Sequence, residues 1–335
     1  MAKNTTVRDV AAAAGVSTAT ASRALAGRST VHPDLVRRVI EASRALGYSA
    51  NPHARALRTQ RTDTVGMVVP SINNPYFIGA VEAVENVLAD QGRSLILCDT
   101  RDDIETEASR IALLINKLVD GLIVIPVSST LSAPALMAAA RDLAVVQFDR
   151  YAEAASTDFV GMDNADGMQQ CLSLLRHEGC RTFVYVGAQP QTTTASERLA
   201  SFLSATTAEE RPTGDQFLGD FTMSWGVAAA TRLLAGDRLP DAVVCGADVI
   251  AVGLMGALRS AGVQIPEQLR LVSFDDSELG RVTVPALASV HQPIDSMATE
   301  AVRLLDMRRE HRDAPIRKSL FQPELITRGS AVLTA

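Results

Sequence analysis

The sequence is poor in tryptophan and in the cysteines and histidines that metal sites and disulfide frameworks require. It contains one tryptophan, four cysteines and five histidines among 335 residues. The cysteines stand singly inside apolar runs, without the paired spacing of a zinc site and without histidines grouped around them. We therefore expect no metal and no cofactor, and we expect the cysteines to be buried, reduced thiols.

Long apolar runs and catalytic motifs are missing as well. No apolar stretch approaches the about 20 residues that a membrane span needs, and the N-terminus is polar, so we expect a cytoplasmic protein without a membrane partner. The sequence has no GxGxxG, GxxxxGK[ST], GxSxG or HExxH motif, and a nucleotide-dependent enzyme would lack its phosphate-binding loop. An α/β sugar-modifying enzyme remains an alternative, which a test for turnover of candidate ligands would separate from a binding protein.

Charge is distributed unevenly along the chain. The formal net charge is −6, but residues 1–61 hold ten Lys and Arg against three acidic residues. This head has a net charge of +7, which leaves −13 for the remainder. A basic head on an acidic body indicates that contacts with nucleic-acid phosphates are confined to one end of the chain.

Within this head, residues 5–27 have the pattern of two short helices joined by a tight turn. Thr6 precedes Asp9 by three residues, the spacing of a capping box. Gly15 suits a left-handed turn, and Ser17 can cap the second helix. That helix then presents short polar groups and one cation, which fit a DNA major groove. The alternative is an alanine-rich hairpin that only packs. The predicted DNA contacts are Thr6, Ser17, Thr18, Ala19, Thr20, Ser22 and Arg23.

The chain resembles the lactose-repressor (LacI/GalR) family of bacterial transcription regulators over nearly its whole length. The resemblance is carried by VRDVAAAAGVSTATASRALAG, VRRVIEASRALGYSANPHARALR and TDTVGMVVP, and more weakly by DGLIVIP, VSFDD and HQP. It implies a homodimeric regulator, usually a repressor, that binds a pseudo-palindromic operator DNA and senses a small metabolite. One departure is His32, where most members have a capping Ser or Thr. No heptad repeat follows the last predicted strand, so we expect dimers and not tetramers.

Residues 51–61 are predicted to connect the head to the body. A helix this short is marginal in water unless something else stabilises it. In the family this segment is a hinge that folds on DNA and inserts a leucine into the minor groove. Leu57 matches that leucine, and Ala54 and Arg55 match its groove-lining neighbours. The alternative is a plain basic linker.

From Thr64 onward, apolar runs of strand length alternate with helical patterns in two similar series. Unbroken apolar strands are typical of parallel sheets covered on both faces. The predicted fold is an N-terminal all-α helix-turn-helix head plus an α/β periplasmic-binding-protein-like core of two doubly wound parallel-sheet lobes. The resemblance implies three crossings between the lobes, near Met162, Gln292 and Gln322. The predicted boundaries are 1–50 for the head, 51–61 for the hinge and 62–335 for the effector-binding and dimerisation core, with an N-lobe near 62–161 and 293–321 and a C-lobe near 163–290 and 323–335.

Lobes of this kind bind ligands beyond the carboxyl ends of their strands, where Asp149, Asp163 and Asp275 are predicted to lie. Carboxylates accept paired hydroxyl hydrogen bonds, and an arginine donates several from a fixed fork. In the family, positions matching Asp275 and Arg198 commonly bind effector, and aromatic residues form the walls. For each carboxylate, the alternative is a helix cap or a hydrogen bond between lobes. The predicted effector site comprises Asn74, Tyr76, Phe77, Asp149, Asp163, Thr194, Arg198, Phe221 and Asp275.

Two features bear on the effector without identifying it. The loop that holds an added arginine in purine-binding relatives reads Gln191-Thr192-Thr193-Thr194 here. This difference argues against a purine and favours a sugar-like polyol. The single tryptophan, Trp225, follows Phe221 in a segment that borders the cleft in relatives, so it either lines the cleft or packs beneath its helix.

Overall fold

The computed structural model describes residues 5–25, 31–48, 61–117, 119–211 and 216–332. They belong to two compact units, Met1–Thr62 and Asp63–Ala335, each described by itself. The predictions for Ala54, Arg55 and Leu57 concern residues outside these ranges.

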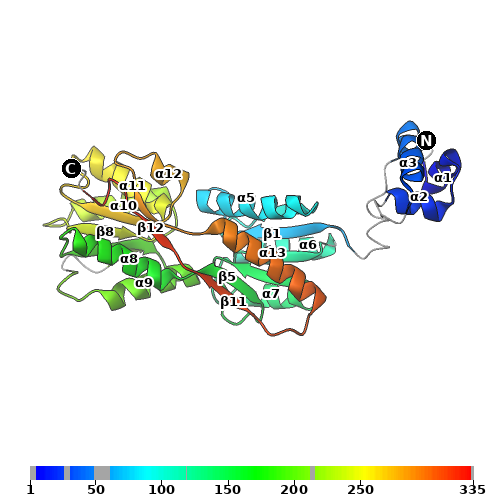
Figure 1. The fold of residues 1–335 in the computed structure, drawn as a ribbon. Coiled ribbons are helices and arrows are strands. Elements are labelled where there is room, and N and C mark those ends of the chain that lie inside the picture. The colour runs from blue at the N-terminus through cyan, green and yellow to red at the C-terminus, as the bar shows by residue number, and fades with distance from the viewer. Residues whose placement is uncertain (1–4, 26–30, 49–60, 118, 212–215, 333–335) are drawn as a thin grey trace. The chain divides into compact units, whose positions relative to one another are not determined.

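The described residues of the first unit form three short helices around a small core (Figure 1). The core is built mainly from alanines, whose small side chains let the helices approach closely. Gly15 ends the first helix with φ +64, and a Cβ there would come within 2.7 Å of the Arg38 guanidinium. Arg38 Nη2 donates to the Ala14 carbonyl at 2.6 Å, which fixes the turn against the third helix. The helices are α1 (Val7–Ala14), α2 (Thr18–Leu25) and α3 (Pro33–Ala45).

The predicted caps of α1 and α2 are confirmed. Thr6 and Asp9 form the reciprocal capping box of α1. Ser17 Oγ accepts the Thr20 N–H at 3.1 Å at the start of α2. His32, in the place of the usual Ser or Thr, accepts the N–H of the second helical residue through Nδ1 at 3.4 Å. The departure at His32 therefore keeps a side-chain acceptor at this helix end.

The second unit begins with a six-stranded sheet, the N-lobe sheet, ordered β11-β5-β4-β3-β1-β2, and its neighbouring strands pair in parallel. Its four inner strands are almost continuously apolar, as expected where helices cover both faces of a sheet. Helices α5 and α13 lie on one face, and α6 and α7 lie on the other (Figure 1). These elements are β1 (Thr64–Val69), α5 (Pro75–Asp90), β2 (Ser94–Asp99), α6 (Ile104–Asn116), β3 (Gly121–Val124), α7 (Ala133–Ala140), β4 (Ala144–Phe148), β5 (Asp158–Met162), α13 (Ile294–Glu310) and β11 (Lys318–Phe321).

A second six-stranded sheet, the C-lobe sheet, is ordered β12-β10-β9-β8-β6-β7. Only the β10–β12 pair is antiparallel among its described pairings. Helices α10 and α11 cover one face, and α8 and α9 cover the other. These elements are α8 (Asn164–His177), β6 (Phe183–Ala188), α9 (Thr193–Ala205), β7 (Gln216–Gly219), α10 (Met223–Leu234), β8 (Ala242–Cys245), α11 (Asp248–Ser260), β9 (Arg270–Asp275), α12 (Glu278–Arg281), β10 (Ala288–His291) and β12 (Glu324–Ile326).

The chain passes between the two sheets three times, after β5, after β10 and between β11 and β12. These points lie at or beside Met162, Gln292 and Gln322, the three crossings that the family resemblance implies. The predicted fold class is confirmed, but two elements were not predicted. Both β7 and α12 are short, and β7 lies at the edge of its sheet with no fully buried residue. A short, half-exposed segment has a weak apolar pattern.

Candidate functional site

A small cavity lies where the carboxyl ends of the strands of the two lobes meet. Asp149 directly follows β4 and lines it from the N-lobe, while Asp275 ends β9 and lines it from the C-lobe. The cavity has room for roughly one water molecule, because the volume that the centre of a water can occupy is about 10 Å³. Its own side chains therefore nearly fill it in this conformation, so a ligand larger than water would bind only after these side chains move or the lobes separate. The lining residues are Asn74, Tyr76, Phe77, Asp149, Arg150, Thr194, Arg198, Phe221 and Asp275.

Eight of the nine predicted effector residues line this cavity, and Asp163 does not. The Asp163 carboxylate accepts the N–H groups of Ala165 and Asp166, each at 3.0 Å, and so caps α8. The expectation that Asp163 faces the cavity is therefore corrected in favour of the helix-cap alternative. That the other eight residues bind an effector stays a prediction.

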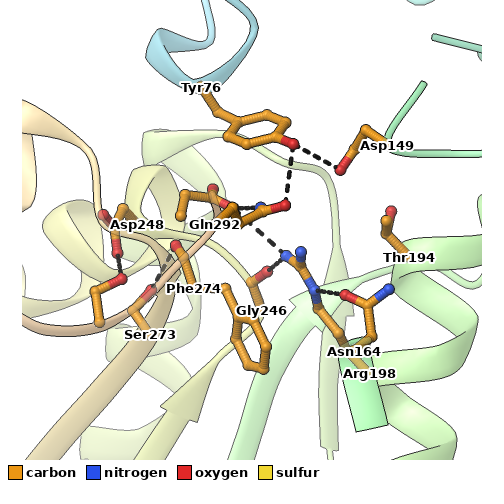
Figure 2. Close-up of polar contacts among 12 residues, drawn as sticks. Tyr76, Asp149, Asn164, Thr194, Arg198, Gly246, Asp248, Ser273, Phe274 and Gln292 are labelled. Carbon is orange, nitrogen blue, oxygen red and sulfur yellow. Dashed lines mark hydrogen bonds and ion pairs between the residues drawn. The ribbon is translucent and has the colours of Figure 1, made fainter. Parts of the chain in front are cut away.

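A chain of polar contacts joins the two lobes across this cavity (Figure 2). The Tyr76 hydroxyl lies 2.9 Å from Asp149 Oδ1 and 3.0 Å from Gln292 Oε1. Gln292 Nε2 donates to Asp275 Oδ1 at 2.9 Å. Since Tyr76 belongs to the N-lobe and Asp275 to the C-lobe, Gln292 at the second crossing links the two halves of the site.

Arg198 is held rigidly on the C-lobe side of the cavity. Its Nε donates to Asn164 Oδ1 at 2.7 Å, and its Nη1 donates to the Gly246 carbonyl at 2.7 Å (Figure 2). The same Nη1 lies 3.6 Å from Asp275 Oδ1, and the guanidinium carbon lies 4.4 Å from the centre of the Phe274 ring. A preorganised, buried guanidinium can donate to a ligand without a large loss of side-chain entropy.

Burial shifts the proton affinity of the acidic groups in the cavity. Desolvation raises the pKa of Asp275 to about 8, although Arg198 opposes the shift. Desolvation also raises the pKa of Asp149, against the attraction of Arg150 and Arg198. The pKa of Tyr76 lies well above its ordinary value for the same reason. At neutral pH, Asp275 is therefore mainly a neutral carboxylic acid that can donate a hydrogen bond.

Two residues of the site, Arg150 and Gln292, were not predicted. Arg150 directly follows Asp149 after the end of β4. This position is the feature of the sequence that could have indicated Arg150 as a site residue. Its guanidinium carbon lies 5.1 Å from the centres of both the Phe77 and Phe221 rings. Gln292 belongs to the HQP motif, but the sequence indicated it only as a crossing point.

Trp225 is not among the residues that line the cavity. Its indole Nε1 donates to the Gly187 carbonyl at 3.0 Å, and the ring packs against the core beneath α10 and α11. The structure therefore agrees with the second alternative, in which this tryptophan packs beneath its helix.

In the first unit, α2 presents an exposed face of small polar side chains and one arginine. Ser17, Thr18, Ala19 and Arg23 are exposed, as is Thr6 before α1, whereas Thr20 and Ser22 are half-buried. Arg23 Nε donates to the Ala19 carbonyl at 3.2 Å, so the side chain lies along the helix surface. The face is available to a DNA groove, and contact with bases remains a prediction.

Two kinds of site are not found within the described ranges. No group of three or more histidine, cysteine, aspartate or glutamate residues there is placed to hold a metal ion. None of the helices in these ranges is both long enough and apolar enough to cross a membrane.

Both parts of the chain match known protein families. Residues 6–51 match the bacterial regulatory proteins of the lacI family, and residues 172–331 match the periplasmic binding protein-like domain. An HTH-type transcriptional repressor, PurR, of Haemophilus influenzae (strain PittEE) is 31% identical over 330 residues, 97% of this chain and 98% of that protein. PurR of Pasteurella multocida (strain Pm70) is 30% identical over 327 residues, with the same shares covered.

Solved structures of regulators share the fold. The complex of the transcriptional regulator CelR with cellobiose is 29% identical, with a TM-score of 0.71 over 97% of this chain and 99% of that chain. The lac repressor dimer bound to operator and the anti-inducer ONPF has a TM-score of 0.87 over 99% of this chain and 100% of that chain. At 22% identity, the lac repressor supports the fold alone.

Proposed function

This chain belongs to the lacI family of bacterial regulatory proteins and is a DNA-binding transcriptional repressor with an effector-binding domain, and we propose that it acts as a homodimer on a pseudo-palindromic operator under the control of a small polar effector. The single observation that carries the effector proposal is the cavity at the strand ends, which both lobes line with buried charged groups. Buried polar groups that converge on one cavity are typical of a ligand site.

The operator-binding part of the proposal assigns residues 1–50 to the head, 51–61 to a hinge and 62–335 to the core. It is supported by the +7 charge of residues 1–61 and by the exposed face of α2. The hinge residues Ala54, Arg55 and Leu57, which lie outside the described ranges, are proposed to enter the minor groove. The proposed contacts in the head are Thr6, Ser17, Thr18, Ala19, Thr20, Ser22 and Arg23.

Arg23→Ala should weaken binding to an operator selected from randomised DNA by about 1–3 kcal/mol, and binding to random DNA by much less. The reason is that an arginine on the exposed face of α2 can bind a guanine edge, which only the operator offers in register. Fluorescence anisotropy with both DNAs measures the difference. Arg37→Ala is the control, because Arg37 is exposed on α3 and ion-pairs with Asp34 at 3.3 Å. Equal losses on both DNAs would make Arg23 a phosphate contact.

The dimer is supported by apolar side chains that the chain leaves exposed. Strand β2 is at the edge of the N-lobe sheet and exposes Ile96 and Leu97, an arrangement that favours a partner. Val282 and Val284, after α12, are exposed in the C-lobe. Small exposed apolar groups on both lobes fit a two-fold interface between the cores.

A sugar-like polyol is the effector class that the polar groups favour. Asp149, Asp275 and Arg198 offer both acceptors and donors to neighbouring hydroxyls, and the similar regulator CelR was solved with cellobiose. A planar heterocycle such as a purine is the second candidate. It is favoured by the aromatic rings of Phe77 and Phe221, which lie on the Arg150 guanidinium with 5.1 Å from each ring centre to its central carbon. The loop from Gln191 to Thr194 supports the polyol, because it lacks the added arginine.

A thermal-shift screen of the full chain against sugars, sugar acids, sugar phosphates and purines tests the proposal. A ligand at 100 times its Kd should stabilise the folded protein by about 2.7 kcal/mol. Each hit is then confirmed by calorimetry and tested for its effect on operator binding. Turnover of a hit would favour the sugar-modifying enzyme instead. If no compound in any class stabilises the protein, the proposed effector classes are wrong.

A further inference from the structure

Arg150 is a buried cation without a hydrogen-bond acceptor among the described residues. The residue is 5% exposed, and its Nε is fully buried without a hydrogen-bond partner. The nearest charged oxygen is Asp149 Oδ2, 3.6 Å from that Nε. Burying a guanidinium with unused donors costs free energy. The arrangement therefore indicates an acceptor that the ligand supplies.

The two phenylalanine rings limit where this acceptor can bind. The Arg150 guanidinium carbon lies over both rings, 5.1 Å from each centre. Cation–π contacts use the faces of a guanidinium and leave the donors in its plane available to a carboxylate. Phe77 belongs to α5 in the N-lobe, and Phe221 precedes α10 in the C-lobe. An anion bound there would contact both lobes.

Three contacts join Asp149, Tyr76, Gln292 and Asp275 in a row. If both carboxylates were ionised, these contacts would be one proton short. One hydroxyl proton cannot be donated to both Asp149 Oδ1 and Gln292 Oε1, which lie 2.9 and 3.0 Å away. If Gln292 turns its oxygen to Tyr76, Asp149 must donate a proton. If the amide is turned around, it donates to Tyr76, and Asp275 must donate to the amide oxygen. In either arrangement, one of the two carboxyl groups is protonated, and the raised pKa of Asp275, about 8, favours the arrangement in which Asp275 holds the proton.

This proton determines the net charge of the cavity lining. The charged residues of the lining are Arg150, Arg198, Asp149 and Asp275. With one carboxyl group neutral, two positive charges face one negative charge. Asp102 also attracts Arg150, but it is exposed and does not line the cavity. A ligand with one negative charge would make the buried site neutral.

We propose that the effector is a polyhydroxylated monocarboxylate, a sugar acid in kind, whose carboxylate binds the in-plane donors of Arg150. Its hydroxyls bind Asp149, Arg198 and Asp275. The inference rests on the proposed function and names the class of effector for the same cavity. A planar heterocycle would occupy the space between the Phe77 and Phe221 rings and would displace Arg150. The sugar acid therefore needs Arg150 in its place, whereas the heterocycle needs it moved away.

The test measures calorimetric affinities of the full chain for matched ligands. The probes are gluconate, galactonate, glucuronate and galacturonate, with the parent neutral sugars, glucose 6-phosphate and guanine as comparisons. At least one sugar acid should bind at least tenfold more tightly than its neutral parent, and Arg150→Met should remove about that factor, because charge-assisted hydrogen bonds are lost. Arg150→Lys, which keeps the charge without the fork, should recover part of the affinity. Arg176→Met, which loses an ion pair with Glu210 outside the cavity, should leave the affinity unchanged.

A pH series gives a second readout that a purely structural role for Arg150 would not change. Affinity for the sugar acid should fall as the pH rises through about 8, because Asp275 then loses its proton and the site loses its net positive charge. The groups that act on Asp275 from the surrounding elements are Arg198, Asp149, Asp248 and Tyr76. In Asp275→Asn, this fall should disappear.

Several results would overturn the inference. Tighter binding of a neutral sugar than of its acid would do so while leaving the proposed function intact. Guanine binding that improves in Arg150→Met would favour the planar heterocycle. Binding of glucose 6-phosphate with no sugar acid bound would show that the anion is a phosphate. If none of these probes binds, the inference is overturned, and the wider screen then decides on the proposed function separately.

Discussion

Replacing Arg198 by methionine should weaken effector binding by about 30-fold or more, the effect of removing one partner of a buried, hydrogen-bonded charge pair. Arg198 lines the cavity and is fixed by Asn164 and Gly246 at 2.7 Å each. A ligand oxygen would therefore lose a donor that is already in place. The ligand to use is the strongest hit of the thermal-shift screen, and calorimetry gives its affinity.

The control for this variant must separate binding from folding. Arg198→Met leaves the Gly246 carbonyl without its donor, so the melting temperature should fall as well. Asp275→Asn keeps the shape of the side chain and the contact with Gln292, and it should also weaken binding. An effector that binds both folded variants as tightly as the unchanged protein would remove Arg198 and Asp275 from the site.

Val282→Asp should convert the proposed dimer to monomers and lower operator affinity by about 100-fold or more. Linking two DNA-binding heads makes the second contact intramolecular, which typically raises affinity by about 10²–10⁴. Val282 is 76% exposed directly after α12. If this position is part of a two-fold interface, each subunit would bury an aspartate there, which is costly. Sedimentation and operator titration measure the two effects.

Leu320→Asp is the matched control for the dimer experiment. Leu320 is 61% exposed, but it belongs to β11, at the opposite edge of the N-lobe sheet from β2. It should leave both the sedimentation and the operator affinity unchanged. If Val282→Asp still sediments as a dimer, the interface lies elsewhere. If the unchanged protein forms a salt-stable tetramer, the expectation of dimers is wrong.

The regular parts of this fold were accessible from the sequence because each has a local physical cause. Buried parallel strands need unbroken apolar runs, and the helix starts need capping side chains such as Thr6 and Ser17. The strand-end carboxylates Asp149 and Asp275 were also accessible, because parallel strands bring their carboxyl ends to one edge. By contrast, β7 has too few apolar residues to predict as a strand.

The different roles of Asp163 and Asp149 were not accessible, although both follow a strand. After Asp163 the chain enters α8 at once, and its carboxylate caps that helix. At Asp149 and Asp275 the backbone instead has φ of +61 and +108, a region that residues other than glycine rarely adopt. These backbone angles turn the chain away from a following helix. Since they depend on tertiary packing, the local sequence does not reveal them.

Arg150 and Gln292 show a second limit of sequence reasoning. Each is next to a predicted feature, but its role depends on a partner from the other lobe or from a crossing segment. Arg150 meets Phe221, about seventy residues away in the chain, and Gln292 meets Tyr76 at a separation of 216 residues. The pattern around each residue carries no information about such a distant partner.

The four cysteines, each at most 9% exposed, provide built-in probes of local opening. Cys98 belongs to the N-lobe layer beneath α6 and α7, Cys171 and Cys180 to the layer beneath α8 and α9, and Cys245 to the layer beneath α10 and α11. A thiol-alkylating reagent can modify each one only when its own layer opens. Mass spectrometry of timed alkylation would therefore give a separate opening rate for each layer in the unchanged protein, and would reveal whether a ligand rigidifies one lobe or both.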